Sequence, residues 1–362
     1  MIMTFLRFAR DHVAPRRLSA SADFPRDLWA DMAKAGLFHV GLPADHGGDG
    51  QGWAAMARAD RVLARHGGSM GFAGSWTGHQ MIARWFVDRF GTPEQRAAWL
   101  PGLAAGTLTA AVAISEPEAG AHPKLLKTTA TADGADVILD GTKAWVTNGP
   151  IADLFIVLAI SNREGERKRY SAYLVPRDTP GLELLPMPAL DILRPSPHCR
   201  MALTGCRVPQ ANRLGPPDSA YETMALPFRD IEDTVGLSGL AGLLGWLIDR
   251  LAALTPADRR ADADAERPLG ELVALLAVLD TAADRCAAAL DAAEGDPDAH
   301  AAGIGARLLA GRIAELAKAY RDGFGIEDAD VAIAFRDIEG SQSIARGPRE
   351  TRVTRLGAKG LG

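Results

Sequence analysis

The stretch "DGTKAWVTNGPIAD", residues 140–153, places Trp145 and Thr147 two positions apart between two turn signals. Residues i and i+2 of a strand point to the same side, so both side chains are predicted on one face, with Lys143 one step back. An indole supplies an apolar wall and a hydroxyl can hydrogen-bond a ring heteroatom, which suits a planar heteroaromatic ligand. The same pattern also fits an ordinary strand with a core Trp and a surface Thr, because both residue types are common in strands.

The elements that carry these residues divide the chain into three regions. Residues 1–108 show apolar side chains at helical spacing in the segments 26–38, 53–66, 77–90 and 93–104. "TPEQ" at 92–95 reads as a helix start with a capping box. Residues 109–215 consist of short β-branched or aromatic runs between Gly, Asp and Asn, which is typical of antiparallel strands. Residues 216–362 return to long apolar stripes joined by polar, Pro-containing links, which predict a helical bundle.

We therefore expect an α+β protein with an N-terminal α-helical domain (1–108), a central antiparallel β-barrel or sandwich (109–215) and a C-terminal helical bundle (216–362). The stripe on residues 240–254 includes Leu243, Leu244, Leu247 and Ile248, which is broad for one seam and suggests an interface with another subunit.

Charge and hydropathy indicate which classes of partner and which cellular location to expect. The 362 residues carry a formal net charge of −5 with Lys and Arg spread along the chain, which argues against nucleic-acid binding. The longest apolar runs, such as 154–160, are shorter than the about 20 residues that span a bilayer, so no membrane span is expected. The start "MIMTFLRFARDH" lacks the apolar core and cleavage site of a signal peptide. We expect a cytoplasmic protein.

Several motifs in one order resemble the acyl-CoA dehydrogenase family. "AVAISEPEAGAH" (111–122), "LDGTKAWVTNG" (139–149) and "VPQANRLG" (208–215) are similar to its "TEPxAGSD", "LNGxKxWITNG" and "VPxxNxLG", and "LPADHGGDG" (42–50) is similar to its "LPxxxGGxG". The resemblance is strong between about residues 36 and 215. It implies an FAD-dependent enzyme acting on acyl-CoA or another acyl thioester, with a four-helix bundle at the C-terminus. It also implies a homodimer or homotetramer, or a hetero-oligomer with a homologue, and electron-transferring flavoprotein as an acceptor.

The resemblance further implies which residues bind FAD. Trp145 and Thr147 would flank its isoalloxazine ring, and Ser115 would face the ring in place of a family Thr. Backbone amides around Glu116–Pro117 and Ala119–Gly120 would lie along the cofactor. The implied cofactor-binding residues are Ala113, Ser115, Gly120, Trp145, Thr147 and Arg267.

The sequence departs from the family pattern near these positions. "GAH" replaces "GSD", so Ala121 loses a hydroxyl and His122 replaces a carboxylate. "RPLG" keeps Arg267 of "RxxFG" but has Leu269 in place of the Phe and is one residue shorter, and "YRDGFG" at 320–325 is a poor match to "QxxGGxG". No metal site is expected.

The reaction implied by the family needs a carboxylate that removes the α-proton of the thioester, and burial suits a carboxylate to this task by raising its pKa. "DIEGSQSIARG" (337–347) is similar to the family's "YEGTSQI", which makes Glu339 one candidate. Aligning the glycines of "GLAG" (239–242) makes Glu232 the other, with Asp233 in place of a family Arg. The number of matching letters favours Glu339, although the segment before it is contracted.

Three other functions stay open at this point. A non-catalytic relative that serves as a subunit or scaffold would explain the departures from the family motifs. A flavin-dependent monooxygenase on the same fold would need no thioester base. A serine hydrolase, suggested by "HGG" at 66–68 and Ser75, is disfavoured because "GSWTG" is not G-x-S-x-G and follows no predicted strand.

Overall fold

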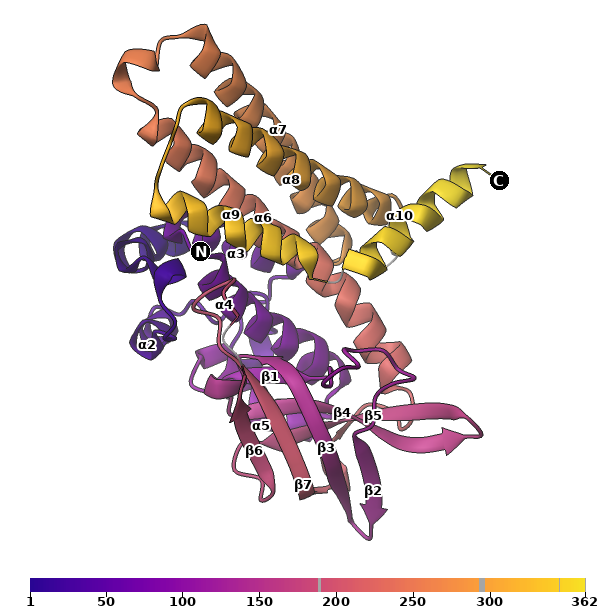
Figure 1. Ribbon diagram of the computed structural model, residues 1–362. Helices are drawn as coiled ribbons and strands as arrows, with labels where there is room; N and C mark the ends of the chain where they lie inside the picture. Colours follow the sequence, from indigo (N-terminus) through magenta and orange to yellow (C-terminus); the bar gives the residue numbers. More distant parts are fainter. Residues whose placement is uncertain (188–189, 293–296, 345, 362) are drawn as a thin grey trace.

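The computed structural model describes residues 1–187, 190–292, 297–344 and 346–361 of the chain. Figure 1 shows the N-terminal helices lying between a β-sheet and a C-terminal bundle of long helices. This arrangement confirms the predicted fold class, a helical region followed by a β-region and a helical bundle.

The N-terminal region consists of short helices whose ends follow local sequence signals. These are α1 (Ile2–Phe8), α2 (Arg26–Lys34), α3 (Trp53–Gly67), α4 (Met70–Ile82) and α5 (Pro93–Ala105). At the start of α5 the hydroxyl of Thr92 accepts from the amide of Gln95 at 3.2 Å, and the Thr92 amide donates to the Gln95 side chain at 2.9 Å. The predicted capping box is therefore confirmed. Helix α4 starts seven residues earlier than the predicted segment 77–90, because Ser69 caps it by accepting from the Phe72 amide at 3.2 Å.

The central region is one sheet. Its strands are β1 (Ala110–Ala113), β2 (Thr129–Asp133), β3 (Asp136–Thr147), β4 (Leu154–Glu164), β5 (Arg167–Pro176), β6 (Leu182–Pro186), β7 (His198–Pro209) and β8 (Arg213–Leu214). They follow the order β6-β7-β3-β2-β4-β5-β8, and β1 pairs with β4.

Most of the pairings in this sheet are antiparallel, as predicted, with the longest ladders between β3 and β7 and between β4 and β5. The sheet is not antiparallel throughout, because β4 pairs in parallel with both β1 and β2. The segment 114–128 causes this difference. It leaves the end of β1 as an irregular loop and returns to the same sheet in the same direction.

The C-terminal region is built on α6 (Leu226–Leu254), which extends a one-turn π-helix at Tyr221–Ala225. Around it lie α7 (Ala263–Ala289), α8 (Pro297–Gly323) and α9 (Ala329–Ser343), and α10 (Arg346–Leu361) follows them (Figure 1). Residues Tyr221–Leu254 are long and apolar enough, by length and composition, to cross a membrane. In the fold, 67% of the most apolar window of this helix is buried, as in the core helix of a bundle.

Helix α6 also packs closely against α3, because its glycines face that helix. A Cβ atom added to Gly239 would lie 2.7 Å from an oxygen of Asp60, and one added to Gly242 would lie 2.4 Å from the carbonyl oxygen of Arg61. The apolar residues Leu243, Leu244, Leu247 and Ile248 are each at most 2% exposed within the single chain. This surface is covered by other helices of the same chain, so its breadth supplies no argument for a second subunit.

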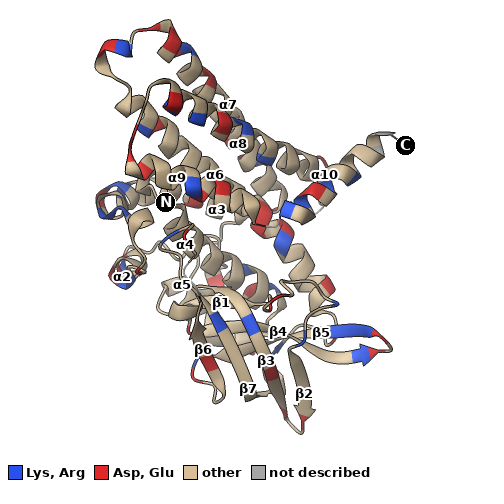
Figure 2. Cartoon of the chain, viewed as in Figure 1, with Lys and Arg blue, Asp and Glu red and all other residues tan. Residues whose placement is uncertain are grey.

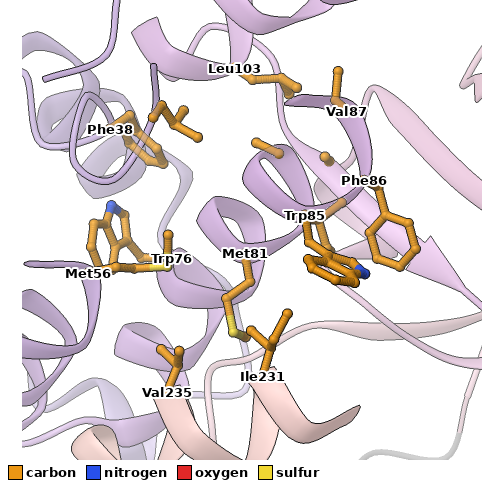
Figure 3. Packing of buried hydrophobic residues seen from close by; sticks show 14 of the residues in the cluster. Phe38, Met56, Trp76, Met81, Trp85, Phe86, Val87, Leu103, Ile231 and Val235 are labelled. Carbon is orange, nitrogen blue, oxygen red and sulfur yellow. The ribbon is translucent and has the colours of Figure 1, made fainter. Parts of the chain in front are cut away.

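The same helix joins the N-terminal region to the bundle. Figure 3 shows Met81 of α4 beside Ile231 of α6, and both side chains are buried. Through these contacts the first turns of α6 are held over α4 and next to the ends of β1 and β3.

Candidate functional site

A cavity of about 240 Å³ opens where the ends of β1 and β3 meet α4 and the start of α6. Its wall includes Ser115, Trp145, Thr147 and Glu232. We call it the Trp145 cavity. Four residues predicted from separate parts of the sequence therefore line one space, although 117 positions separate the first from the last.

Trp145 reaches this cavity through an irregularity in β3. The pairing of β3 with β7 shifts register between Lys143 and Val146, and Trp145 has a φ of 59°. Side chains other than Gly rarely adopt such a backbone conformation, and it is often found at functional sites. The indole remains 48% exposed. A large apolar ring held open to solvent in this way is available to a ligand.

The predicted common face needs one correction. Trp145 and Thr147 do line the same cavity, but Lys143 does not share their face, because the bulge interrupts the alternation of side chains. The Lys143 side chain is fully buried instead, with its Nζ 3.0 Å from Oε1 of Glu116. It also donates to the carbonyl oxygen of Ile114 at 3.2 Å.

This buried ion pair fixes the loop that follows β1. Glu116 accepts from the amides of Lys127 and Thr128 at 2.7 and 2.9 Å, in addition to Lys143. Burial alone would raise the pKa of Glu116, but Lys143 and the Thr128 contacts lower it on balance. Burial lowers the pKa of Lys143 to about 8 in spite of the neighbouring carboxylate. The lowered pKa favours the charged form of Glu116, whereas the lowered pKa of Lys143 favours its neutral form. The cost of desolvating this ion pair therefore offsets much of the attraction between the two charges.

The backbone amides around Glu116–Pro117 and Ala119–Gly120, which the family resemblance places along the cofactor, make hydrogen bonds within the loop itself. The amide of Glu116 donates to the carbonyl of Gly120 at 2.9 Å, the Gly120 amide donates back at 3.0 Å, and the Ala119 amide donates to Pro117 at 2.7 Å. These three donors are already used inside the loop. These hydrogen bonds shape the loop, which contributes Ile114, Ser115 and Ala121 to the cavity wall.

Several polar atoms of the cavity lack partners and are available to a ligand. The hydroxyls of Ser115 and Thr147 make no hydrogen bond within the described residues. Asn148, with a φ of 61°, donates from its side-chain nitrogen to the carbonyl of Ser75 at 2.7 Å. Its side-chain oxygen is buried and has no partner among the described residues. An apolar ring wall beside two hydroxyls and an unpaired acceptor fits a planar heteroaromatic group such as a flavin.

Glu232 lies on the face of α6 that points into the cavity, together with Phe228 and Arg229. Its side chain is exposed to the cavity, yet the surrounding protein removes much of its water. This desolvation, and then the charge of Asp233, raises the pKa of Glu232 to about 7. Arg229 opposes the rise. A carboxylate with such a pKa can accept a proton near neutral pH, and a ligand that fills the cavity would strengthen the effect.

The other predicted residues lie elsewhere. Glu339 is exposed on α9 and lines a different cavity of about 710 Å³, between α6, α8, α9 and α10. Arg267 is exposed in the second turn of α7 and is not part of the Trp145 cavity wall. Ala113 is buried in β1, and Gly120 has a φ of 53° in the loop, and neither lines the cavity. His122 is exposed beside that loop.

Sequence reasoning missed three polar residues of this wall: Asn148, Tyr221 and Arg229. Asn148 was interpreted only as a turn residue before Gly149. Arg229 stands three residues before Glu232 on one helix, and such spacing places two side chains on the same face.

Two family models match the chain, and they cover the N-terminal helices and the β-region that line this cavity, but not the α6 wall that carries Glu232. The acyl-CoA dehydrogenase N-terminal domain matches residues 1–107, and the acyl-CoA dehydrogenase middle domain matches residues 111–206.

The chain is also similar in sequence to curated acyl-CoA dehydrogenases. The mitochondrial isovaleryl-CoA dehydrogenase of Pongo abelii is 30% identical over 254 residues, which cover 68% of this chain and 59% of that relative. The chain thus spans about 60% of the length of such curated relatives.

Solved structures show the fold over nearly the whole chain. Butyryl-CoA dehydrogenase from Megasphaera elsdenii superposes with a TM-score of 0.87 at 21% identity, covering 100% of this chain and 98% of that one. The FAD complex of PigA superposes with a TM-score of 0.85 at 22% identity, covering 99% of this chain and 97% of that one. By its two matching domains and its fold, the chain belongs to the acyl-CoA dehydrogenase family.

Proposed function

We propose that this protein is an FAD-dependent acyl-CoA dehydrogenase, which removes hydrogen from the α and β carbons of an acyl thioester in the Trp145 cavity. The observation that carries the proposal is that Glu232, whose pKa is raised to about 7, lines the same cavity as Ser115, Trp145 and Thr147. The isovaleryl-CoA and butyryl-CoA dehydrogenases among its relatives support the class of substrate.

The side chains of the cavity would hold the cofactor in distinct ways. Trp145 would stack against the flavin ring with its exposed indole, and the hydroxyls of Ser115 and Thr147 would hydrogen-bond ring heteroatoms. The unpaired oxygen of Asn148 would accept from a ligand N–H group. When bound, FAD would supply the acceptor for the hydride that leaves the β carbon.

Glu232 would act as the base for the α-proton. In this role its carboxylate must lose its proton near neutral pH and must be basic enough to take another, which a pKa of about 7 provides. The neighbouring carboxylate of Asp233 would otherwise disfavour negative charge on the substrate. Asp233 is engaged by Arg352 at 2.7 Å, so much of its charge is offset on the far side of α6.

We favour Glu232 over Glu339 as the base, because Glu232 lines the Trp145 cavity. The sequence match around Glu339 has more letters in common with the family motif, but Glu339 lines the separate cavity between α6, α8, α9 and α10. Glu339 stays the second candidate.

The partners follow from the same proposal. The substrate would be acyl-CoA or another acyl thioester, and an electron-transferring flavoprotein would reoxidise the flavin. We expect the protein to act as a homodimer or homotetramer, or with a homologue as a hetero-oligomer.

The proposal is tested by reconstitution with FAD, followed by addition of a panel of acyl-CoAs without oxygen. We expect stoichiometric flavin uptake, bleaching of flavin absorbance by at least one thioester, and weaker flavin binding after Trp145→Ala. The matched control is Trp99→Ala, which removes a half-buried Trp on α5 outside the cavity. Failure of the folded protein to take up FAD, or FAD binding with no bleaching by any thioester, would count against the proposal.

A further inference from the structure

The connection between β6 and β7 leaves the sheet and passes the helices before it returns. Its residues 190–197, directly before β7, form neither helix nor strand, and we call them the 190–197 segment. Figure 1 shows the connection rising from β6 toward α4 and α9. No strand pairing fixes the backbone of this segment, so its polar groups need other partners to hold it in place.

The 190–197 segment is clamped between α4 and α9, and a glycine on each helix makes room for it. A Cβ atom added to Gly71 of α4 would lie 2.0 Å from the carbonyl oxygen of Leu193. A Cβ atom added to Gly340 of α9 would lie 2.8 Å from the side chain of Ile192. Both distances are shorter than real Cβ contacts, so the segment packs directly against the backbone of both helices.

Asp337 of α9 holds this segment at Leu193. The Leu193 amide donates to Oδ1 of Asp337 at 2.9 Å, and Asp337 is only 1% exposed. The neighbouring Arg336 lies 3.2 Å from the same oxygen, and Figure 2 shows a positive and a negative position next to each other on α9. Leu193 has a φ of 55°, which a leucine keeps only where its surroundings impose it. Because the hydrogen bond to Asp337 is one of these constraints, its loss should release the segment.

The other end of the segment fixes a residue of the Trp145 cavity. The amide of Asn148 donates to the carbonyl oxygen of Pro197 at 2.8 Å. The Ser75 hydroxyl donates to the Ser196 hydroxyl at 3.1 Å, and the Ser75 carbonyl accepts from the Asn148 side chain at 2.7 Å. These contacts leave the side-chain oxygen of Asn148 buried at the cavity wall, with no partner among the described residues.

We propose that Asp337 is a positioning residue of the Trp145 cavity, which acts through the 190–197 segment to hold the Asn148 oxygen toward the ligand. Asp337 is not part of the cavity wall, so its effect has to pass through the segment. The identification of the ligand as FAD rests on the proposed function. The coupling between α9 and Asn148 does not, because it follows from contacts within the chain.

The test compares FAD affinity in two variants of one residue. Asp337→Ala removes the acceptor of the Leu193 amide, and we expect it to weaken FAD binding about tenfold, the equivalent of one hydrogen bond lost at Asn148. Asp337→Asn keeps a side-chain oxygen that can accept from that amide, so it should bind FAD within about threefold of wild type. Affinity is measured by titrating each folded apoprotein with FAD, well below its unfolding temperature.

Asp328→Ala is the matched control on the same helix. Asp328 caps the start of α9 by accepting from the amides of Asp330 and Val331, both at 3.0 Å, and it lies outside the segment and the cavity wall. This variant should destabilise α9 without changing FAD affinity. If Asp337→Ala does not fold, Ser196→Ala removes the contact with Ser75 farther along the segment and should weaken FAD binding in the same direction.

Hydrogen exchange of the FAD-free protein measures the coupling without the cofactor. The peptide that contains Asn148 should exchange about tenfold faster in Asp337→Ala, because the hydrogen bond from the Asn148 amide to Pro197 is loosened. The same peptide should exchange at the wild-type rate in Asp337→Asn and in Asp328→Ala.

Wild-type FAD affinity and wild-type exchange in Asp337→Ala, or equal weakening of FAD binding by Asp337→Ala and Asp328→Ala, would overturn the inference. Weak FAD binding by Asp337→Asn would do the same, because the hydrogen bond to Leu193 would then not be the cause. If the wild-type protein binds no FAD, the proposed function fails, and the exchange experiment still decides whether Asp337 positions Asn148.

Discussion

Replacing Lys143 by Met should destabilise the β-region by removing one partner of a buried ion pair. The Lys143 side chain is fully buried and that of Glu116 is 5% exposed, so the carboxylate left behind cannot be rehydrated easily. Breaking such a pair typically costs about 3–5 kcal/mol. Glu116 would keep its hydrogen bonds from the amides of Lys127 and Thr128, which places the expected loss near the lower end, at about 3 kcal/mol.

The assay is urea unfolding, with thermal unfolding as a second measurement. If all 362 residues unfold together, a loss of 3 kcal/mol lowers Tm by roughly 4 °C, and the shift is several times larger if the β-region unfolds separately. Adding Glu116→Gln to Lys143→Met should recover part of the loss, because no unpaired charge remains. Lys127→Met, at an exposed position of the same region, is the matched control. A loss below about 1 kcal/mol in Lys143→Met would show that Glu116 does not depend on Lys143 in this way.

Three further predictions concern titratable side chains outside the site. His79 donates to the carbonyl of Leu103 at 3.1 Å and accepts from the Ala110 amide at 3.1 Å, and burial lowers its pKa to about 4. The unfolded chain therefore binds a proton that the folded chain does not. Unfolding free energy should fall by roughly 1.5 kcal/mol between pH 6.5 and 5 on account of this residue, and His79→Gln should remove that slope while the exposed His12→Gln should not. Burial raises the pKa of Asp60 from 3.8 to about 7, so the stability that the protonated group contributes is lost as pH rises from about 4 to 7. Asp60→Asn should raise Tm more at pH 8 than at pH 5, and equal effects at both would contradict this. Asp291 accepts from the Trp53 and Ala54 amides at 2.8 and 3.0 Å, so Asp291→Ala should cost about 1–2 kcal/mol in chemical unfolding, and no loss would show that this cap is dispensable.

Local signals were sufficient to predict much of the fold. The capping box at Thr92 and the turn-bounded strands of the β-region depend on neighbours in sequence, and pattern reasoning identifies them. The start of α4 and the parallel pairings of β4 were not predicted, because they depend on a Ser69 cap outside the apolar pattern and on the path of the loop after β1.

The site could be predicted only in part for a similar reason. Trp145, Thr147 and Ser115 were identified from the family resemblance, and the structure brings them to one cavity with Glu232. The bulge that turns Lys143 to the opposite face follows from the register with β7, which the sequence does not display. The choice between Glu232 and Glu339 likewise depends on how α6 and α9 pack, since both residues lie in long helices with acceptable local matches.

Glu232 is proposed here as the base of the reaction in the Trp145 cavity. This role is tested most directly by the rate of flavin reduction after rapid anaerobic mixing with an acyl-CoA that bleaches the wild-type protein, measured for Glu232→Gln and Glu339→Gln with FAD bound. We expect Glu232→Gln to slow flavin reduction by about 10²–10⁴-fold, while Glu339→Gln stays close to wild type. Reduction at the wild-type rate in Glu232→Gln, or a comparable slowing in Glu339→Gln alone, would contradict it.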